Sequence, residues 1–159
     1  MSTLTFFHWL AQTTIAIYMR DSTWGFAIVE IFHLLSLAVF GGAVLFVDLR
    51  ILDFAFVTQP ASRVVREFLP FTIGGVVAMF LSGSLLLASG PMRYYYNTAF
   101  RVKIWLFFIA LVFHFILQAC VTRDNSDPRN SAIWRKSAAV TSLLLWISIG
   151  LAGRAIGYF

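Results

Sequence analysis

The stretch WGFAIVEIFHLLSLAVFGGAVLFV, residues 24–47, decides the fold class, because its 24 positions contain one acidic residue and no Lys or Arg. A helix needs about 20 apolar residues to cross the hydrocarbon core of a bilayer. Three further stretches of this kind follow, at residues 69–88, 102–121 and 138–158. They are continuously apolar, whereas a membrane β-barrel needs alternating strands. We therefore expect an all-α fold, an antiparallel four-helix transmembrane bundle formed by one domain over residues 1–159.

The composition is typical of a membrane protein, with 60% hydrophobic and 12% charged residues, whereas a soluble domain has about 25% charged residues. The N-terminal segment, residues 5–19, is apolar but too short to span, and it contains Trp9 and Tyr18, which favour the membrane interface. We expect this segment to form a short interfacial helix. The lipid bilayer is then the main expected partner.

Lys and Arg residues occur on both sides of the four stretches. One side has seven of them: Arg50, Arg63, Arg66, Arg123, Arg129, Arg135 and Lys136. The other side has five: Arg20, Arg93, Arg101, Lys103 and Arg154. Because the more basic side usually faces the cytoplasm, both termini are predicted to be periplasmic. The net charge of +5 then comes from these basic edges, and no nucleic-acid partner is expected.

Two of the three histidines, His33 and His114, lie near the middle of apolar stretches. An ionisable residue inside a membrane indicates a functional site by default. His33 follows Asp21 by 12 residues and His114 follows Arg101 by 13, with both charges assigned to the same membrane face. At 1.5 Å per residue, each imidazole should lie roughly 18 to 20 Å inward from its charge. We therefore expect the two histidines to be level.

Two level histidines on facing helices predict one haem b per chain, because bis-imidazole ligation needs that arrangement and four-helix bundles hold cofactors in this way. Two alternatives remain open: histidines that are hydrogen-bonded within the core, and a path for protons or metal ions. His8 lies in the interfacial segment, where an imidazole can contact water, and no ligand is assigned to it.

Glu30 is the only acidic residue well inside a stretch, and it precedes His33 by three positions on the same helical face. A lone carboxylate there is costly unless it is paired or neutral. One interpretation is a structural ion pair with Arg154 or Lys103. The other is functional: Arg101, Lys103 and Arg154 bind haem propionates or a quinone carbonyl, while Glu30 relays a proton.

Two other groups are assigned no chemistry. Asp48, Arg50 and Asp53 are interpreted as a solvated or locally paired helix end. The single cysteine, Cys120, cannot form an intramolecular disulfide and is interpreted as a small buried apolar residue.

Small residues recur every four positions in the second stretch, at Gly74, Ala78 and Ser82, with Gly75 and Gly83 beside them. Such a stripe lets helix backbones approach closely. We expect this face to pack within the bundle or against a second copy in a homo-oligomer.

Short motifs are spread over nearly the whole chain. They are Arg20-Asp21-Ser22, Glu30-Ile31-Phe32-His33, Asp48-Leu49-Arg50-Ile51-Leu52, Leu69-Pro70-Phe71-Thr72, Ser82-Gly83, Asn97-Thr98-Ala99-Phe100-Arg101-Val102-Lys103, Phe113-His114 and Gly153-Arg154-Ala155-Ile156-Gly157-Tyr158. In this order they resemble a family of small bacterial four-helix inner-membrane proteins of uncharacterised function. The resemblance implies a multi-pass protein of the bacterial inner membrane but names no reaction.

The architecture alone is also similar to four-helix b-type cytochromes and to the membrane domain of copper-resistance proteins. Cytochromes with two haems usually use four helix-borne histidines, so this chain fits one haem unless His8 or a residue such as Met79 is a ligand. Copper-handling proteins would be expected to have clusters of Met and His at a membrane edge, whereas Met19, Met79 and Met92 are isolated here.

Together these observations predict an electron-transfer subunit, rather than a stand-alone enzyme, with one haem b between His33 and His114. It would exchange electrons with a quinone or a periplasmic protein. The first alternative is a small transporter or a proton or metal-ion path that uses Glu30, His33 and His114. The second alternative is an assembly or scaffold subunit without a ligand.

Overall fold

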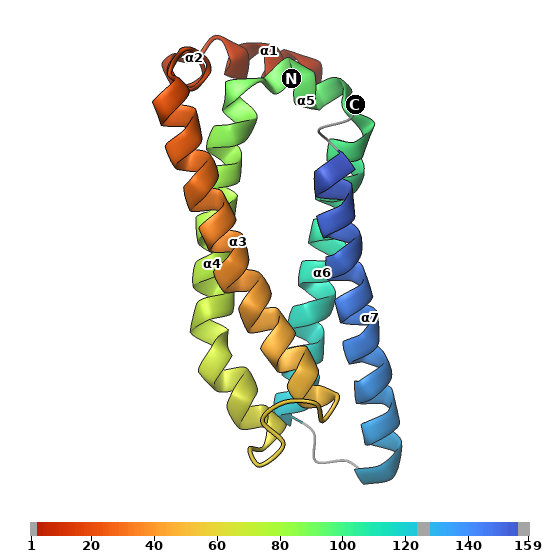
Figure 1. Cartoon of the computed structure of the whole chain (residues 1–159). Coiled ribbons are helices and arrows are strands. Elements are labelled where there is room, and N and C mark those ends of the chain that lie inside the picture. Colours follow the sequence, from red (N-terminus) through yellow and green to blue (C-terminus); the bar gives the residue numbers. More distant parts are fainter. Residues whose placement is uncertain (1–2, 124–127, 156–159) are drawn as a thin grey trace.

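The computed structural model describes residues 3–123 and 128–155, except for the side chains of residues 128–131 and 155 (Figure 1). This part of the chain forms seven helices and no strand. The long helices are α3 (Thr23–Ile51), α4 (Ala61–Ser89), α6 (Thr98–Arg123) and α7 (Pro128–Ala155). The short helices are α1 (Thr3–Ala11), α2 (Thr14–Asp21) and α5 (Pro91–Tyr96). The predicted all-α four-helix fold is confirmed.

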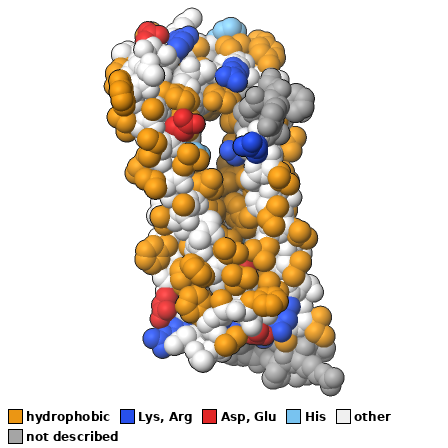
Figure 2. Space-filling model, in the orientation of Figure 1, with side chains coloured by type: hydrophobic (Ala, Val, Ile, Leu, Met, Phe, Trp, Pro, Cys, Tyr) orange, Lys and Arg blue, Asp and Glu red, His pale blue; other side chains and the backbone are white. Residues whose placement is uncertain are grey.

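The four long helices are long and apolar enough to cross a membrane, with mean hydropathies between 1.4 and 2.4 over their most apolar windows. Large apolar side chains cover their outward faces (Figure 2), and Trp105, for example, is 71% exposed. A soluble monomer rarely exposes so extended an apolar surface. The chain is therefore a multi-pass membrane protein whose outer surface suits lipid.

The helices extend beyond the expected spans. The ranges 24–47, 69–88 and 102–121 lie inside α3, α4 and α6, whereas residues 156–158 of the fourth range lie outside the described residues. The largest difference is at the start of α4, which begins at Ala61 and continues through Pro70. Proline removes one backbone hydrogen bond, and membrane helices tolerate this loss because neighbouring groups satisfy the freed carbonyl.

The long helices form two pairs, α3 with α4 and α6 with α7. Figure 1 shows the pairs close together at the end that holds the α3–α4 connection, which we call the loop end. The pairs diverge toward the opposite end, where α1, α2 and α5 lie across the bundle. We call this the α1–α5 end, and both the first and the last described residues lie there.

One glycine brings α3 and α4 close together. A Cβ atom on Gly75 would lie 2.7 Å from the Phe40 Cβ atom, so only glycine fits there. Of the predicted small residues, Gly75 and Ser82 pack within the bundle, whereas Gly74 does not. Ser82 is buried, but Gly74 is exposed and has open space around it. Gly75, rather than Gly74, makes the close contact between the helices.

The N-terminal segment forms two short helices instead of the single helix expected over residues 5–19. Thr13 separates them: its hydroxyl accepts a hydrogen bond from the Ala16 N–H (3.3 Å) and donates one to the Leu10 carbonyl (2.8 Å). Threonine is a favoured N-cap, because its side chain satisfies a free N–H group of the first turn. The chain therefore turns at Thr13, and exposed His8 lies on α1.

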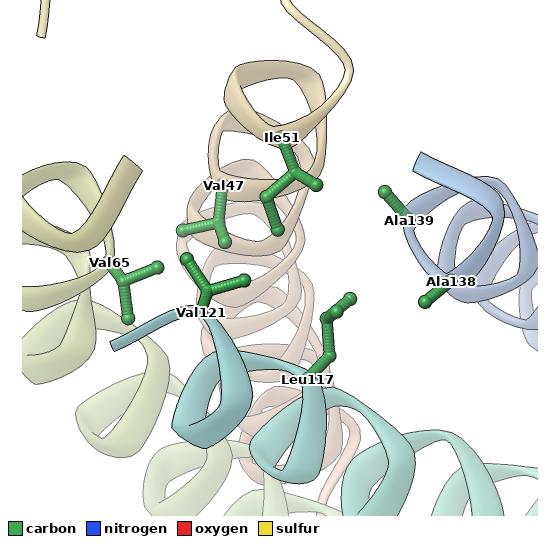
Figure 3. Packing of buried hydrophobic residues seen from close by; sticks show 7 residues of the cluster. All are labelled: Val47, Ile51, Val65, Leu117, Val121, Ala138 and Ala139. Carbon is green, nitrogen blue, oxygen red and sulfur yellow. The ribbon is translucent and has the colours of Figure 1, made fainter. Parts of the chain in front are cut away.

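Apolar side chains from all four long helices converge at the loop end (Figure 3). They are Val47 and Ile51 from α3, Val65 from α4, Leu117 and Val121 from α6, and Ala138 and Ala139 from α7. We call this group the loop-end cluster. In this cluster the two helix pairs meet near the loop end.

Candidate functional site

His33 is half-buried on α3 and contacts α4. Its Nδ1 atom lies 2.8 Å from the Ser82 hydroxyl oxygen, and that hydroxyl also lies 2.6 Å from the Ala78 carbonyl. Because Ser82 has one hydroxyl proton and donates it to Ala78, the His33 Nδ1–H group must donate to Ser82. Neutral His33 therefore keeps its Nε2 lone pair free to accept a proton or to bind a metal.

His114 is fully buried on α6. Its Nε2 atom lies 2.9 Å from the Gln118 amide nitrogen, one helical turn further along. Within the described part of the chain, its Nδ1 atom has no hydrogen-bond partner, and neither has the Gln118 Oε1 atom. The indole of Trp146, on α7, contacts the imidazole edge-on at 6.4 Å between ring centroids. A buried imidazole nitrogen is thus left without a partner.

The two histidines are not level, contrary to the expectation from sequence. Trp146 contacts both His114 and Phe40, with ring centroids 6.4 Å and 4.8 Å apart, so His114 lies near the depth of Phe40. Phe40 is seven residues beyond His33 on α3, which corresponds to about 10 Å along the helix. His33 lies instead near Lys103 of α6, whose charge acts on it.

The prediction of level histidines was wrong because the two charged residues from which the residues were counted, Asp21 and Arg101, lie at different depths. Asp21 ends α2, which lies across the α1–α5 end of the bundle. Arg101 lies inside α6, only two residues before Lys103, and is therefore already close to the depth of His33. A long Arg side chain can extend from such a position toward the membrane surface.

The charged residues predicted around the histidines do not form the expected ion pair. The side chains of Glu30, Arg101 and Arg154 are exposed, and among the described residues Glu30 has no ion pair with Lys103 or Arg154. Lys103 is partly buried, and a Cβ atom on Gly153 would lie 3.4 Å from its Nζ atom. Figure 2 shows a hollow between the helix pairs near the α1–α5 end, with acidic and basic side chains on opposite walls.

A second group of polar residues lies deeper in the bundle, and most of it has no signal in the sequence. Within the described residues, every buried side-chain nitrogen or oxygen without a hydrogen-bond partner belongs to this group. Its members are Asp48 on α3, His114 and Gln118 on α6, and Ser142 and Trp146 on α7. We call these five residues the polar layer.

The Asp48 carboxyl group is the most unexpected member of the polar layer, because the sequence predicted a solvated or locally paired helix end. Its side chain is fully buried, and neither oxygen has a hydrogen bond of ordinary geometry to the described residues. The neighbouring group is the Ser142 hydroxyl. The cause of the burial is that α3 continues to Ile51 and buries the face that also carries Val44. Asp48 lies four residues after Val44 and three before Ile51, a spacing that places all three on one face.

The other two members of that predicted helix end behave as expected. Arg50 and Asp53 form an ion pair with a nitrogen–oxygen distance of 2.8 Å, and Lys136 of α7 contacts the second Asp53 oxygen at 2.8 Å. Cys120, by contrast, is exposed on the outer side of α6, so its interpretation as a buried residue is wrong.

Apolar residues separate the polar layer from both ends of the bundle. Toward the loop end lie Ile51 and Val121 of the loop-end cluster, three residues beyond Asp48 and Gln118 in the chain. Toward the α1–α5 end lies a second cluster around Phe40, Val44 and Met79. The polar layer is therefore closed on both sides in this conformation.

A family model, described as a family of unknown function (DUF6644), matches residues 5–159. The chain belongs to this family. The match agrees with the resemblance seen in the sequence, which also covered nearly the whole chain. No curated protein and no solved structure matches the chain.

In this member of the DUF6644 family, the ligation of haem b by His33 and His114 stays a prediction. Bis-imidazole ligation needs both histidines at one depth, on opposite sides of the macrocycle. Because His114 lies near Phe40 in depth, such a haem would need a change in the relative positions of α3 and α6. Within the described residues there is no group of three or more His, Cys, Asp or Glu side chains that could hold a metal ion, but a haem with two histidine ligands does not need one.

Proposed function

We propose that this protein provides a path for protons through the membrane, with Asp48 and His114 as the proton-carrying groups. The observation that carries the proposal is the polar layer, in which six buried polar atoms of five residues have no hydrogen-bond partner among the described residues. Each such atom costs about 1–3 kcal/mol compared with a satisfied one. A bundle that needed only stability would place apolar residues here.

The chemistry of the polar layer suits protons. Asp48 accepts a proton on a carboxylate oxygen and gives it back as a carboxylic acid. The Gln118 amide nitrogen can only donate, so neutral His114 accepts at Nε2 and carries its own proton on Nδ1. His114 therefore gives up a proton from Nδ1 and takes one up at Nε2 when the Gln118 side chain moves away. Ser142 and Trp146 supply the O–H and N–H groups that keep such carriers and water in place. Chains of acidic residues and histidines inside a bundle are characteristic of proton relays in membrane proteins.

Glu30 and His33 extend the path toward the α1–α5 end. Glu30 is exposed, and His33 keeps a free Nε2 atom beside the hollow end of the bundle. The cluster around Phe40 separates them from His114, so a proton can pass only when water enters or the helix pairs move apart. This is the behaviour of a gated path rather than of an open pore.

Proteoliposomes with an internal pH-sensitive dye test this proposal. With an imposed pH gradient and valinomycin to balance charge, the wild-type protein should dissipate the gradient faster than protein-free liposomes do. Asp48→Asn should abolish that flux, and His114→Gln should reduce it. The control is Glu67→Gln, because Glu67 is exposed and bonded only to Arg63 at 2.8 Å. Equal fluxes in the wild type and in Asp48→Asn would disprove the proposal.

Electron transfer through one haem b is the second candidate, and the free Nε2 atom of His33 is the observation that favours it. Arg101, Lys103 and Arg154 on α6 and α7 would bind propionates or the carbonyl of a quinone, which would connect the haem to a quinone or a periplasmic protein. This function requires His114 to move toward His33. A protein that shows neither proton flux nor a cofactor would be the ligand-free scaffold.

We also propose that the protein lies in a bacterial inner membrane with the loop end in the cytoplasm. The loop end contains seven of the twelve Lys and Arg residues, and the more basic end usually faces the cytoplasm. Both termini are then periplasmic, and the α1–α5 end receives protons from outside.

A further inference from the structure

A cavity of about 220 Å³ lies at the loop end, beyond the loop-end cluster. Its wall combines three cationic side chains, one carboxylate and four apolar residues: Arg50, Arg135, Lys136, Asp53, Ile51, Ala61, Val121 and Ala132. These residues come from all four long helices and from the α3–α4 connection. Neither the family match nor the proposed proton path uses this cavity.

The charges in the cavity favour an anion. Arg50 and Lys136 face the single carboxylate of Asp53, so these three side chains leave an excess positive charge of one. Arg135 also lines the wall and has an interaction partner of its own. Arg50 is held firmly: its side chain is 13% exposed, its Nε–H group donates to the Gln59 carbonyl (2.6 Å) and its Nη1 group bonds to Asp53 (2.8 Å). Its Nη2 group has no partner among the described residues.

The Asp53 carboxylate already occupies part of this cationic site. One oxygen contacts Arg50 and the other contacts Lys136, each at 2.8 Å, so a single carboxylate bridges α3 and α7. The Asp53 backbone has a φ of 63°, in the left-handed region that non-glycine residues rarely adopt. Phe56, in the same connection, has a φ of 51°. The connection is thus held in a strained conformation that places an anion between two cations.

We propose that the loop-end cavity binds a phosphate group and that the Asp53 carboxylate is a tethered competitor for the same cations. A phosphate oxyanion matches the planar guanidinium of Arg50, which donates two parallel hydrogen bonds to such groups. Lys136, whose side chain is 48% exposed, adds a mobile cation at the mouth. The phosphate comes either from a lipid headgroup or from solution.

The test uses the full chain in phosphatidylcholine nanodiscs, titrated calorimetrically with inorganic phosphate. Lys136→Gln should weaken binding by about tenfold, because it removes a charge-assisted hydrogen bond. Asp53→Asn should tighten binding several-fold, because the internal competitor loses its charge. Arg63→Gln is the matched control: Arg63 belongs to the same end of the bundle, but its partner is Glu67 and it does not line the cavity.

A second arm distinguishes the two sources of phosphate. If a lipid headgroup is the occupant, nanodiscs with phosphatidylglycerol should raise the unfolding temperature of the wild type, and Lys136→Gln should lose this gain while Arg63→Gln keeps it. If free phosphate is the occupant, phosphatidylglycerol should have no such effect. The proposal is overturned if Asp53→Asn binds inorganic phosphate no more tightly than the wild type and shows no gain with phosphatidylglycerol. This outcome does not depend on the folding of Lys136→Gln.

Discussion

The Asp48 carboxyl group on α3 lies beside the Ser142 hydroxyl on α7, and both are buried without a hydrogen bond of ordinary geometry to the described residues. This pair joins the two halves of the bundle at the centre of the polar layer. Such a contact contributes little to folding, because an unpartnered polar group loses its bonds to water and gains none in return. It therefore indicates a position retained for function.

Replacing Asp48 by leucine should make the protein more stable and inactive. An apolar side chain of the same branched shape removes the unpartnered carboxyl group, so the free energy of unfolding should rise by about 1–3 kcal/mol. Thermal unfolding in detergent and proton flux in liposomes measure the two effects. Asp53→Leu, the same change in a residue that has two ion pairs, should instead lower stability. A lower unfolding temperature for Asp48→Leu would contradict the absence of a partner.

The two neighbouring glycines of α4 should respond oppositely to alanine. Gly75→Ala places a methyl group 2.7 Å from the Phe40 Cβ atom and 3.0 Å from its Cα atom, so the helices must separate. We expect a loss of about 1–3 kcal/mol in the free energy of unfolding. Gly74→Ala enters open space and should be neutral or stabilising by up to about 1 kcal/mol. Equal effects of both substitutions would show that the register of α3 on α4 is different.

The ion pairs of Asp53 should make stability depend on acid pH. The hydrogen bond from Lys136, with Arg50 adding to it, holds the pKa of Asp53 below its usual range. A lowered pKa in the folded state gives stability that is present above the unfolded pKa of about 3.9 and is lost as the pH falls through the folded pKa.

Asp53→Asn should accordingly be less stable than the wild type at pH 7, by about 0.2–1 kcal/mol for such exposed pairs. The difference in the free energy of unfolding between the two proteins should shrink as the pH falls below about 3.9. Thermal unfolding followed by circular dichroism over this range measures it. A difference that stays constant down to low pH would mean that Asp53 stabilises the protein by some other contact.

The depth offset of the histidines predicts how any haem would depend on them. If cells with adequate haem supply incorporate haem, only one of the two single variants, His33→Ala or His114→Ala, should lose it. The reason is that the two imidazoles lie at different depths. The pyridine haemochrome assay and the reduced alpha band measure this, with His8→Ala as the control. One haem per chain with a sharp low-spin band that either substitution abolishes would show that the helices rearrange around a bis-histidine site.

The proposed orientation can be tested with single cysteines in a Cys120→Ser background. Tyr96, at the α1–α5 end, and Val57, at the loop end, are 70% and 60% exposed, so either position should accept a cysteine. In intact cells with a permeable outer membrane, an impermeant maleimide should label Tyr96→Cys, and Val57→Cys should react only after lysis. The reverse pattern would place the loop end, and with it the phosphate cavity, outside.

The long apolar stretches predicted the fold, because hydropathy depends on composition and tolerates errors of a few residues. The depth of each histidine in the membrane was harder to predict, since it depends on where its helix begins relative to the membrane surface. Arg101 lies inside α6, whereas Asp21 ends a helix that lies across the bundle. The prediction from sequence placed both residues at the same depth.

The polar layer could be predicted only in part. His114 was a candidate because histidine is rare inside membrane helices, and the spacing of Val44, Asp48 and Ile51 would have indicated that Asp48 is buried. Gln118 and Ser142 have no such signal, because amides and hydroxyls occur in many membrane helices without function. Only the packing of α6 against α7 shows that their partners are missing.

The close contact between Gly75 and Phe40 has a consequence for motion. Interlocked backbones at this distance leave α3 and α4 little freedom to slide past one another, because packed surfaces switch between discrete arrangements rather than deform continuously. The α3–α4 pair therefore moves as one rigid arm, and a conformational cycle must change its angle to the α6–α7 arm. Spin labels within one arm should report a constant separation, whereas labels on different arms near the α1–α5 end should report the opening and closing of the protein.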